Sequence, residues 1–185
     1  QMCIRDRLYS MIEYAKSKSQ RLFLDITTNG RLLTVELVDK LFSIGLDNIN
    51  INDYRGDRDK NPDGWSSYVE PIYRAYDNNP KISFKRRRLD EILPNYAGNI
   101  PQTFNAEDFG FCNYPFRKLT IAYNGNILLC CDDFLYDTCF GNVMNDKLLD
   151  CWNNSELNVI RLSLLDNKRI GLCEKCNDFQ EYNVF

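Results

Sequence analysis

Eight cysteines and no histidine define the chemistry that this chain of 185 residues could carry out. Cys173 and Cys176 form a C-x-x-C pair, and Cys112 and Cys130 flank a run with the pattern of a hairpin. Thiolates spaced in this way can share one metal centre, and without histidine neither imidazole ligands nor imidazole acid–base catalysis is available. The chain therefore predicts an all-sulfur metal site, for which zinc and iron–sulfur clusters are the two candidates.

The stretch between Cys112 and Cys130 predicts a β-hairpin. Residues 119–123 alternate in polarity, residues 127–129 form a second apolar run, and Asn124-Gly125 between them is typical of a type I′ turn. Such a hairpin returns Cys130 toward Cys112, where the C-x-x-C pair can meet both. The predicted metal ligands are Cys112, Cys130, Cys173 and Cys176.

Three further cysteines lie within the same region of the sequence. Cys131 follows Cys130 directly and should point to the opposite face if the strand continues. Cys139 and Cys151 are each more typical of a small buried apolar residue than of a ligand. We interpret Cys151 as a core residue and regard Cys139 as the strongest reserve ligand.

Several other features accompany these cysteines in a fixed order: Leu119-Thr120-Ile121, Gly125, Cys130-Cys131-Asp132, Gly141-Asn142-Val143, Trp152 and Arg161. With the four predicted ligands they closely resemble the SPASM domain, the auxiliary-cluster module at the C-terminus of many radical S-adenosylmethionine (radical SAM) enzymes. Family members with two auxiliary clusters carry further cysteines after the C-x-x-C, and none follows Cys176 here. The resemblance therefore implies one auxiliary 4Fe-4S cluster, which relays electrons or orients substrate.

The first half of the chain has the pattern of an α/β fold. Residues 8–19 predict a helix, residues 21–30 a buried strand that ends in a turn, and residues 48–52 a second strand. Between the strands, Thr34 can cap a helix that Gly45 ends. Strand, helix and strand at this spacing form a βαβ unit, which predicts a parallel sheet. A helix over 65–76 and a strand over 81–84 follow.

This first half resembles the C-terminal part of the partial (β/α) barrel of radical SAM enzymes, through T-N-G at 28–30 and G-L-D-x-I-x-I at 45–51. Polar groups at the C-terminal ends of barrel strands line the active site. The resemblance thus implies that Asn29 and Asn52 contact S-adenosylmethionine, although the serine usual after the fourth strand is replaced here. The alternative is that Asn29 forms a turn and Asn52 caps a strand end.

Arg86 belongs to a run of four cations, Lys85-Arg86-Arg87-Arg88. An arginine here could bind the carboxylate of S-adenosylmethionine or of an acidic substrate. The alternative is that the run forms a solvated edge of the sheet.

The run N-Y-A-G-N at 95–99 resembles a segment that often precedes SPASM domains. We therefore expect residues 8–100 to form the barrel portion with a linker, and residues 101–185 to form the small α+β SPASM domain, a hairpin with helices around the four cysteines. Residues 1–7 resemble a translated sequencing adapter. On this expectation the chain is the C-terminal fragment of a longer protein, and Cys3 is not a ligand.

Composition limits the partners that we expect. The net charge of −3 gives no reason to expect nucleic acid as a partner. No apolar run approaches the roughly 20 residues of a membrane span, so no membrane association is expected. No secretory signal is visible, which favours metal binding over disulfides and a cytoplasmic location.

The family cleaves S-adenosylmethionine at a 4Fe-4S cluster held by a C-x-x-x-C-x-x-C motif, and this chain has no such motif. We therefore expect the chain alone not to be a competent enzyme. Its parent would be an oxidoreductase or maturase that acts on a peptide, a protein or another small substrate, with S-adenosylmethionine, a second 4Fe-4S cluster and an electron donor such as ferredoxin or flavodoxin. The alternatives are a stand-alone iron–sulfur electron-transfer protein and a structural module that holds zinc on four cysteines.

Overall fold

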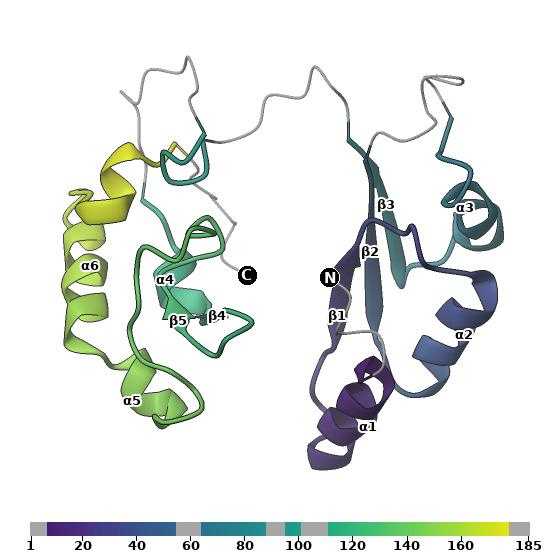
Figure 1. Cartoon of the computed structure of the whole chain (residues 1–185), viewed down its shortest axis with the longest axis horizontal. Coiled ribbons are helices and arrows are strands. Elements are labelled where there is room, and N and C mark those ends of the chain that lie inside the picture. The colour runs from purple at the N-terminus through teal and green to yellow at the C-terminus, as the bar shows by residue number, and fades with distance from the viewer. Residues whose placement is uncertain (1–6, 55–63, 88–94, 101–110, 178–185) are drawn as a thin grey trace. The chain divides into compact units, whose positions relative to one another are not determined.

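The computed structural model describes residues 7–54, 64–87, 95–100 and 111–177 (Figure 1). The chain divides into two compact units, Gln1–Glu91 and Ile92–Phe185. The run at 95–99 therefore belongs to the second unit, although we expected it to form a linker of the first. Residues 1–6, which contain most of the adapter-like segment and Cys3, lie outside the described part.

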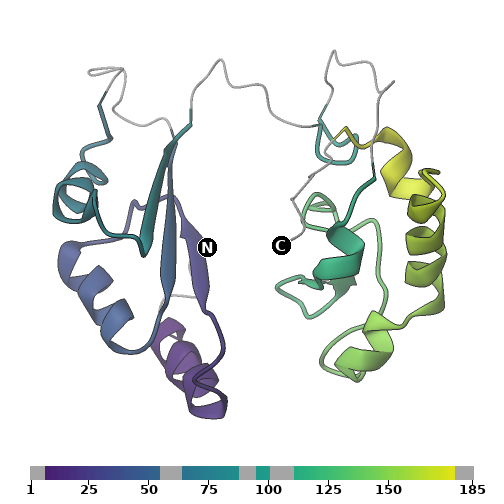
Figure 2. The same cartoon turned by 180° about the vertical axis from the view of Figure 1, so that it is seen from behind.

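The first unit alternates helices and strands in the order α1 (Leu8–Lys18), β1 (Asp25–Thr28), α2 (Val35–Ser43), β2 (Asn48–Asp53), α3 (Glu70–Tyr76) and β3 (Ile82–Arg86). The three strands form one parallel sheet in the order β1-β2-β3. Helices α2 and α3 cover the same face of this sheet (Figures 1 and 2). The predicted α/β pattern and parallel sheet are confirmed.

An aliphatic core fills the space between the sheet and its helices, made of Ile12, Val38, Leu41, Leu46, Ile49, Ile51, Val69, Ile72 and Ile82. Strand β2 shows how the sequence builds it, because its residues alternate strictly between buried and half-buried. Ile49, Ile51 and Asp53 face the helices, and the asparagines between them face away.

The ends of α2 follow the predicted capping pattern. The Thr34 hydroxyl accepts a hydrogen bond from the backbone N–H of Leu37 (3.2 Å), which satisfies one free donor of the first turn. Gly45 follows the C-cap with φ +106°, a conformation that a glycine adopts without steric cost.

Two predictions for this unit were wrong in detail. The strand expected over 21–30 is limited to β1, and Leu22 and Phe23 before it are 44% and 72% exposed. The residues of β1 also alternate between exposed and half-buried, because this strand lies at the edge of the sheet. The helix expected over 65–76 begins at Glu70, which places Pro71 in its first turn.

The second unit contains α4 (Tyr114–Arg117), β4 (Thr120–Ile121), β5 (Ile127–Leu128), α5 (Leu148–Trp152), α6 (Ser155–Leu165) and a short 3-10 helix, η2 (Gly171–Lys175). Its packed cluster of buried residues consists of Ile127, Leu129, Phe140, Cys151 and Leu157. The side chain of Asn154 caps α6 by accepting from the N–H groups of Glu156 and Leu157, as predicted.

The predicted hairpin forms, but its turn differs from the prediction. β4 and β5 pair antiparallel, with Thr120 opposite Leu128 and Ile121 opposite Ile127. The N–H of Gly125 bonds to the carbonyl of Ala122 (2.9 Å), and Gly125 alone in the turn has a positive φ, +88°. The turn thus centres on Tyr123-Asn124, followed by a bulge at Gly125, because a type I′ turn would also require φ > 0 at Asn124.

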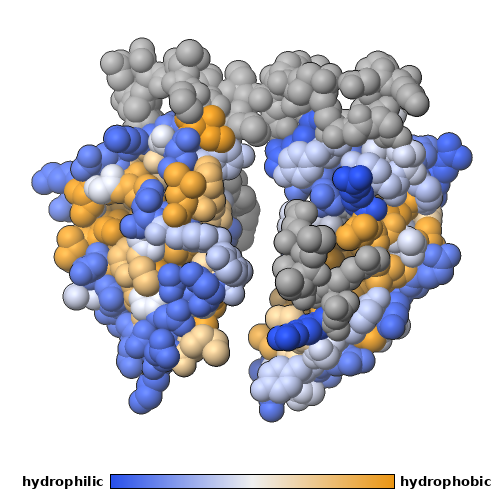
Figure 3. All heavy atoms as spheres, in the orientation of Figure 1, coloured by the Kyte–Doolittle hydropathy of each residue, from blue (hydrophilic) through white to orange (hydrophobic). Residues whose placement is uncertain are grey.

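Helix α6 packs through one face only. Leu157, Arg161 and Leu164 are buried, whereas Val159 and Leu162 are 57% and 63% exposed, and apolar residues are visible on this side of the unit in Figure 3. Across the described residues, no helix has the length and apolar character needed to cross a membrane.

Candidate metal centre

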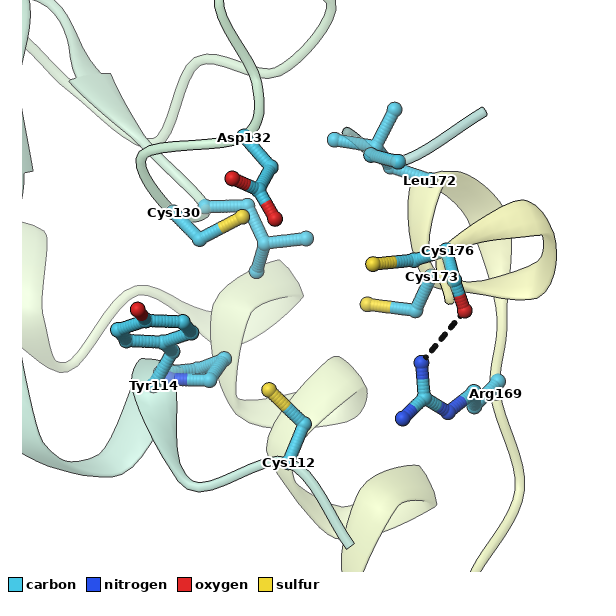
Figure 4. A pocket seen from close by; sticks show the side chains of 11 residues that line it. Cys112, Tyr114, Cys130, Asp132, Arg169, Leu172, Cys173 and Cys176 are labelled. Carbon is cyan, nitrogen blue, oxygen red and sulfur yellow. Dashed lines mark hydrogen bonds between the residues drawn. The ribbon is translucent and has the colours of Figure 1, made fainter. Parts of the chain in front are cut away.

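The four predicted ligands line one cavity in the second unit. Its walls are formed by Ala97, Cys112, Tyr114, Pro115, Leu129, Cys130, Asp132, Arg169, Leu172, Cys173 and Cys176. Figure 4 shows the sulfurs of Cys112, Cys130, Cys173 and Cys176 pointing into the same space from three directions. Segments far apart in the sequence thus deliver four thiols to one place.

Cys112 is positioned by α4 and by a buried arginine behind it. Arg161 is 8% exposed, and its Nε donates to the carbonyl of Pro115 (2.8 Å). Its Nη1 donates to the carbonyl of Trp152 (2.6 Å) and to Asn158 Oδ1 (2.7 Å). A buried guanidinium that binds backbone carbonyls in this way ties α4, and with it Cys112, to α5 and α6.

Cys130 follows β5 and is oriented by the loop that comes after it. Asp133 is fully buried, and its carboxylate accepts from the N–H groups of Asp137 (2.8 Å) and Thr138 (3.0 Å). The Thr138 hydroxyl in turn accepts from the N–H of Leu129 (2.9 Å). These bonds turn the chain sharply after Cys130 and leave its side chain facing the cavity.

Cys173 and Cys176 come from η2 and its C-cap. The N–H of Cys176 bonds to the carbonyl of Cys173 (3.2 Å), which closes the C-x-x-C into a tight turn. The Nη1 group of Arg169 donates to the carbonyl of Cys176 (3.0 Å), the bond drawn as a dashed line in Figure 4. Arg169 therefore lies on the C-x-x-C side of the cavity.

The turn at 95–99 closes the site and was not recognised as part of it from the sequence. Asn95 donates to the carbonyl of Lys175, and its Oδ1 accepts from the N–H of Asn177 (3.0 Å). Asn99 Nδ2 donates to the carbonyl of Asp132 (3.3 Å), and Ala97 lines the cavity. This turn thus links the C-x-x-C segment to the segment that follows Cys130. The N-x-A-G-N pattern was visible, but its contact with Cys173-x-x-Cys176 is a tertiary feature.

Burial makes the thiols of Cys130 and Cys173 hard to ionise. It raises the pKa of Cys173 to about 11, with smaller repulsion from Cys112 and Cys176. Burial also raises the pKa of Cys130, and the nearby charge of Asp132 adds to this effect. Because a metal binds the thiolate, ligation would have to displace protons from both groups.

The donor set of the cavity fits an iron–sulfur cluster or zinc, since it offers four thiols. The cavity measures about 20 Å³, room for about one water molecule. Within the described part of the chain, no three Cys, Asp or Glu side chains lie close enough together to hold a single metal ion. The four sulfurs thus surround the cavity without being in ligating contact.

The other described cysteines lie elsewhere. Cys151 is 2% exposed in the core, which agrees with our interpretation. Cys131 is exposed, and its thiol donates to Asp132 Oδ1 (3.9 Å). Cys139 was expected to be buried and is instead exposed, because it lies in a loop that lines a separate pocket beside α6.

The three candidate contacts to S-adenosylmethionine lie at the C-terminal ends of the strands in the first unit's sheet. Asn29 follows β1, and Asn52 and Arg86 occupy the ends of β2 and β3. Asn29 Oδ1 accepts from the N–H of Arg31 (3.1 Å), so Asn29 also forms the turn considered as an alternative. The Arg86 guanidinium lies 5.0 Å from the centre of the Trp65 ring.

The face of the sheet that α2 and α3 leave uncovered is polar. Asn50 Nδ2 donates to both carboxylate oxygens of Asp25 (2.8 Å each), and its Oδ1 accepts from Ser83 (2.5 Å) and from Asn48 (3.2 Å). Asn52 lies two residues after Asn50 in β2, so its side chain is on the same face. Arg86 is the neighbour of the buried Asp53 in the strand register, so its side chain is on the opposite face. The structure thus places the side chains of Arg86 and Asn52 on opposite faces of the sheet.

Residues 112–177 match the family model of the SPASM domain, an iron–sulfur cluster-binding domain. The chain is 26% identical over 158 residues to the S-adenosyl-L-methionine-dependent 2-deoxy-scyllo-inosamine dehydrogenase of Niallia circulans. The aligned region covers 83% of this chain and 60% of that protein. The prediction of a SPASM domain is confirmed. The chain spans less than two thirds of this relative's length.

The fold resembles two crystal structures of BtrN. The structure in complex with AdoMet and 2-DOIA has a TM-score of 0.75 and 21% identity, over 93% of this chain and 67% of that one. The selenomethionine protein in an open conformation has a TM-score of 0.66 and 20% identity, over 93% of this chain and 64% of that one. The mixed α/β fold with a small parallel sheet is therefore shared with BtrN.

Proposed function

We propose that this chain is part of a radical SAM oxidoreductase and that its second unit holds one auxiliary 4Fe-4S cluster on Cys112, Cys130, Cys173 and Cys176. The observation that carries the proposal is the convergence of these four thiols on one cavity within the segment that matches an iron–sulfur domain. When bound, such a cluster supplies one-electron redox chemistry. The protein orients the segments that carry the four sulfurs through Arg161, Asp133 and Asn95.

For the first unit we propose the role of the C-terminal part of a partial barrel. Its uncovered sheet face carries a hydrogen-bonded polar network around Asn50, and Asn29 and Asn52 lie at the strand ends where such barrels bind ligands. We propose these two asparagines as contacts to S-adenosylmethionine. Arg86 faces the helix side, next to Trp65, and is the weakest of the three candidates.

The substrate is proposed to be a small polar molecule. The Niallia circulans relative is named for a small hydroxylated amine, and the carboxylate, amides and hydroxyl of Asp25, Asn48, Asn50 and Ser83 offer matching hydrogen-bond partners. Of the substrates that we expected from the sequence, a peptide, a protein or another small molecule, we thus propose the last. Electrons would come from a carrier such as ferredoxin or flavodoxin in a cytoplasmic setting.

Cleavage of S-adenosylmethionine would need residues beyond these 185, because they contain no C-x-x-x-C-x-x-C motif. We therefore propose that this chain binds the auxiliary cluster but does not by itself generate the radical.

The test is anaerobic reconstitution of the full chain, followed by iron, sulfide and zinc analysis. We expect about four irons and four sulfides per chain, as for one cluster on four thiolates, together with broad brown absorption. Stoichiometric zinc after anaerobic purification, with no sulfide taken up on reconstitution, would instead establish the zinc-binding alternative.

A further inference from the structure

Two charged side chains of opposite sign line the cysteine cavity. Among the described residues that form its walls, Asp132 and Arg169 are the only acidic and cationic groups. Figure 4 shows Asp132 beside Cys130 and Arg169 on the side of Cys173 and Cys176. The two charges therefore act on the four sulfurs from opposite sides.

Both groups are held in place by the surrounding structure. Arg169 Nη1 donates to the carbonyl of Cys176 (3.0 Å). Asp132 is 5% exposed, its carboxylate accepts from the Cys131 thiol, and its own carbonyl accepts from Asn99. These contacts hold both charges at the wall of the cavity, so each contributes an electrostatic field at the sulfurs.

The positions of the two charges fix the sign of their effects. The Arg169 guanidinium lies on the side of Cys173 and Cys176, where a cation favours negative charge on the sulfurs. The Asp132 carboxylate lies beside Cys130, where an anion disfavours it.

A cluster held by four thiolates is negatively charged, and one-electron reduction makes it more so. Reduction potentials of such clusters depend on net charge and on hydrogen bonds in their surroundings. A nearby cation stabilises the reduced form, which has one more electron, and a nearby carboxylate destabilises it.

We propose that Arg169 and Asp132 set the reduction potential of the auxiliary cluster, with Arg169 raising it and Asp132 lowering it. Neither residue is a ligand, and neither gains or loses a proton in this role; the electron is added to the cluster and comes from the external reductant. The proposal rests on the proposed function, because it requires that the cluster bind in this cavity.

The experiment is an anaerobic redox titration of the reconstituted full chain, monitored by electron paramagnetic resonance, with dithionite as the reductant. We expect Arg169→Met to lower the equilibrium constant for reduction about tenfold, which is about 59 mV for one electron. We expect Asp132→Asn to raise this equilibrium constant by a similar factor. Arg169→Lys, which keeps the positive charge, should leave the equilibrium constant close to that of the wild type. Lys168→Met is the matched control, because this exposed neighbour loses the same charge outside the cavity.

The outcomes separate the two proposals. If the wild-type chain takes up no cluster, the proposed function fails and this inference fails with it. Suppose that the wild type holds the cluster but the reduction potentials of Arg169→Met and Asp132→Asn both equal that of Lys168→Met. The inference is then overturned and the proposed function stands. Should Arg169→Met lose the cluster, the shift in Asp132→Asn alone decides, since an unchanged or lowered potential in that variant contradicts the proposal.

Discussion

In the described part of the first unit, nine buried aliphatic side chains pack into one cluster between the sheet and its helices. In the described part of the second unit, the packed cluster has five members, one of them a cysteine, and other buried side chains such as Leu128 and Leu164 lie outside it. Each fully buried aliphatic side chain contributes about 1.5–3 kcal/mol, so the first unit concentrates its apolar stabilisation in a single core. The second unit instead relies on side chains that bond to the backbone around the cysteine cavity, such as Arg161, Asp133 and Asn95. From this difference we expect that loss of a bound metal would weaken the second unit and leave the first unchanged.

The largest expected effect is that of metal removal on the reconstituted protein. Chelation should strongly lower the stability of the second unit, because metal binding and folding are coupled in small cysteine-rich domains. Hydrogen–deuterium exchange resolved by peptide should then show loss of protection over 111–177 and unchanged protection over 35–53. Equal loss in both regions would contradict the comparison.

A cavity in the aliphatic core should destabilise the first unit and leave the second unit unchanged. Leu41 is fully buried between α2 and the sheet, so Leu41→Ala should lower the free energy of unfolding of the first unit by about 2–5 kcal/mol. Iron content should not change. The measurement is urea denaturation followed by Trp65 fluorescence in a Trp152→Phe background, and a parallel loss of iron would show that the two units are coupled.

A smaller effect is expected at the turn that closes the cysteine cavity. Gly98 has φ +83°, and a Cβ there would come within 2.7 Å of Lys175 Cβ. Gly98→Ala should therefore cost the second unit about 1–3 kcal/mol and speed the loss of iron to a chelator. Gly171→Ala is the matched control, because Gly171 also has a positive φ, +56°, but has no atom near the added Cβ. Equal effects of the two changes would argue against a packed turn.

The smallest effect is the pH dependence of the metal-free second unit. Burial raises the pKa of Cys173 to about 11, above the value of about 8.5 for a thiol in an unfolded chain. The stability that this thiol contributes is thus complete below pH of about 8.5 and is lost as the pH rises toward the folded-state pKa, because only the unfolded state readily releases the proton. Urea midpoints of the metal-free protein should fall over this range, and Cys173→Ala should flatten the decline. No such decline is expected in the metal-loaded protein, whose thiolates are already ligated.

Periodicity and capping residues were sufficient to predict the first unit's sheet, since Thr34, Gly45 and the alternation along β2 act locally. The exposure of Leu22 and Phe23 could not be predicted, because it depends on β1 lying at an edge of the sheet. Similarly, Asn124-Gly125 indicated a hairpin but not which residue pair occupies the turn centre.

The second unit was predicted from the spacing of its cysteines, and the four predicted ligands do line one cavity. The exposure of Cys139 and the contacts of Asn95 with Lys175 and Asn177 were missed. Both depend on how loops fold over each other, which no local pattern records. The charges of Asp132 and Arg169 were likewise visible in the sequence, but their position on opposite sides of the cavity was not.

The most direct test of the four-cysteine centre is the iron content of single Cys→Ser variants of the reconstituted full chain. Cys112→Ser, Cys130→Ser, Cys173→Ser and Cys176→Ser should each lower the iron content markedly or leave an exchangeable iron. Cys131→Ser, Cys139→Ser and Cys151→Ser should retain the wild-type content, because these cysteines lie outside the cavity. Full iron content in Cys112→Ser, together with loss in Cys139→Ser or Cys131→Ser, would contradict the assignment.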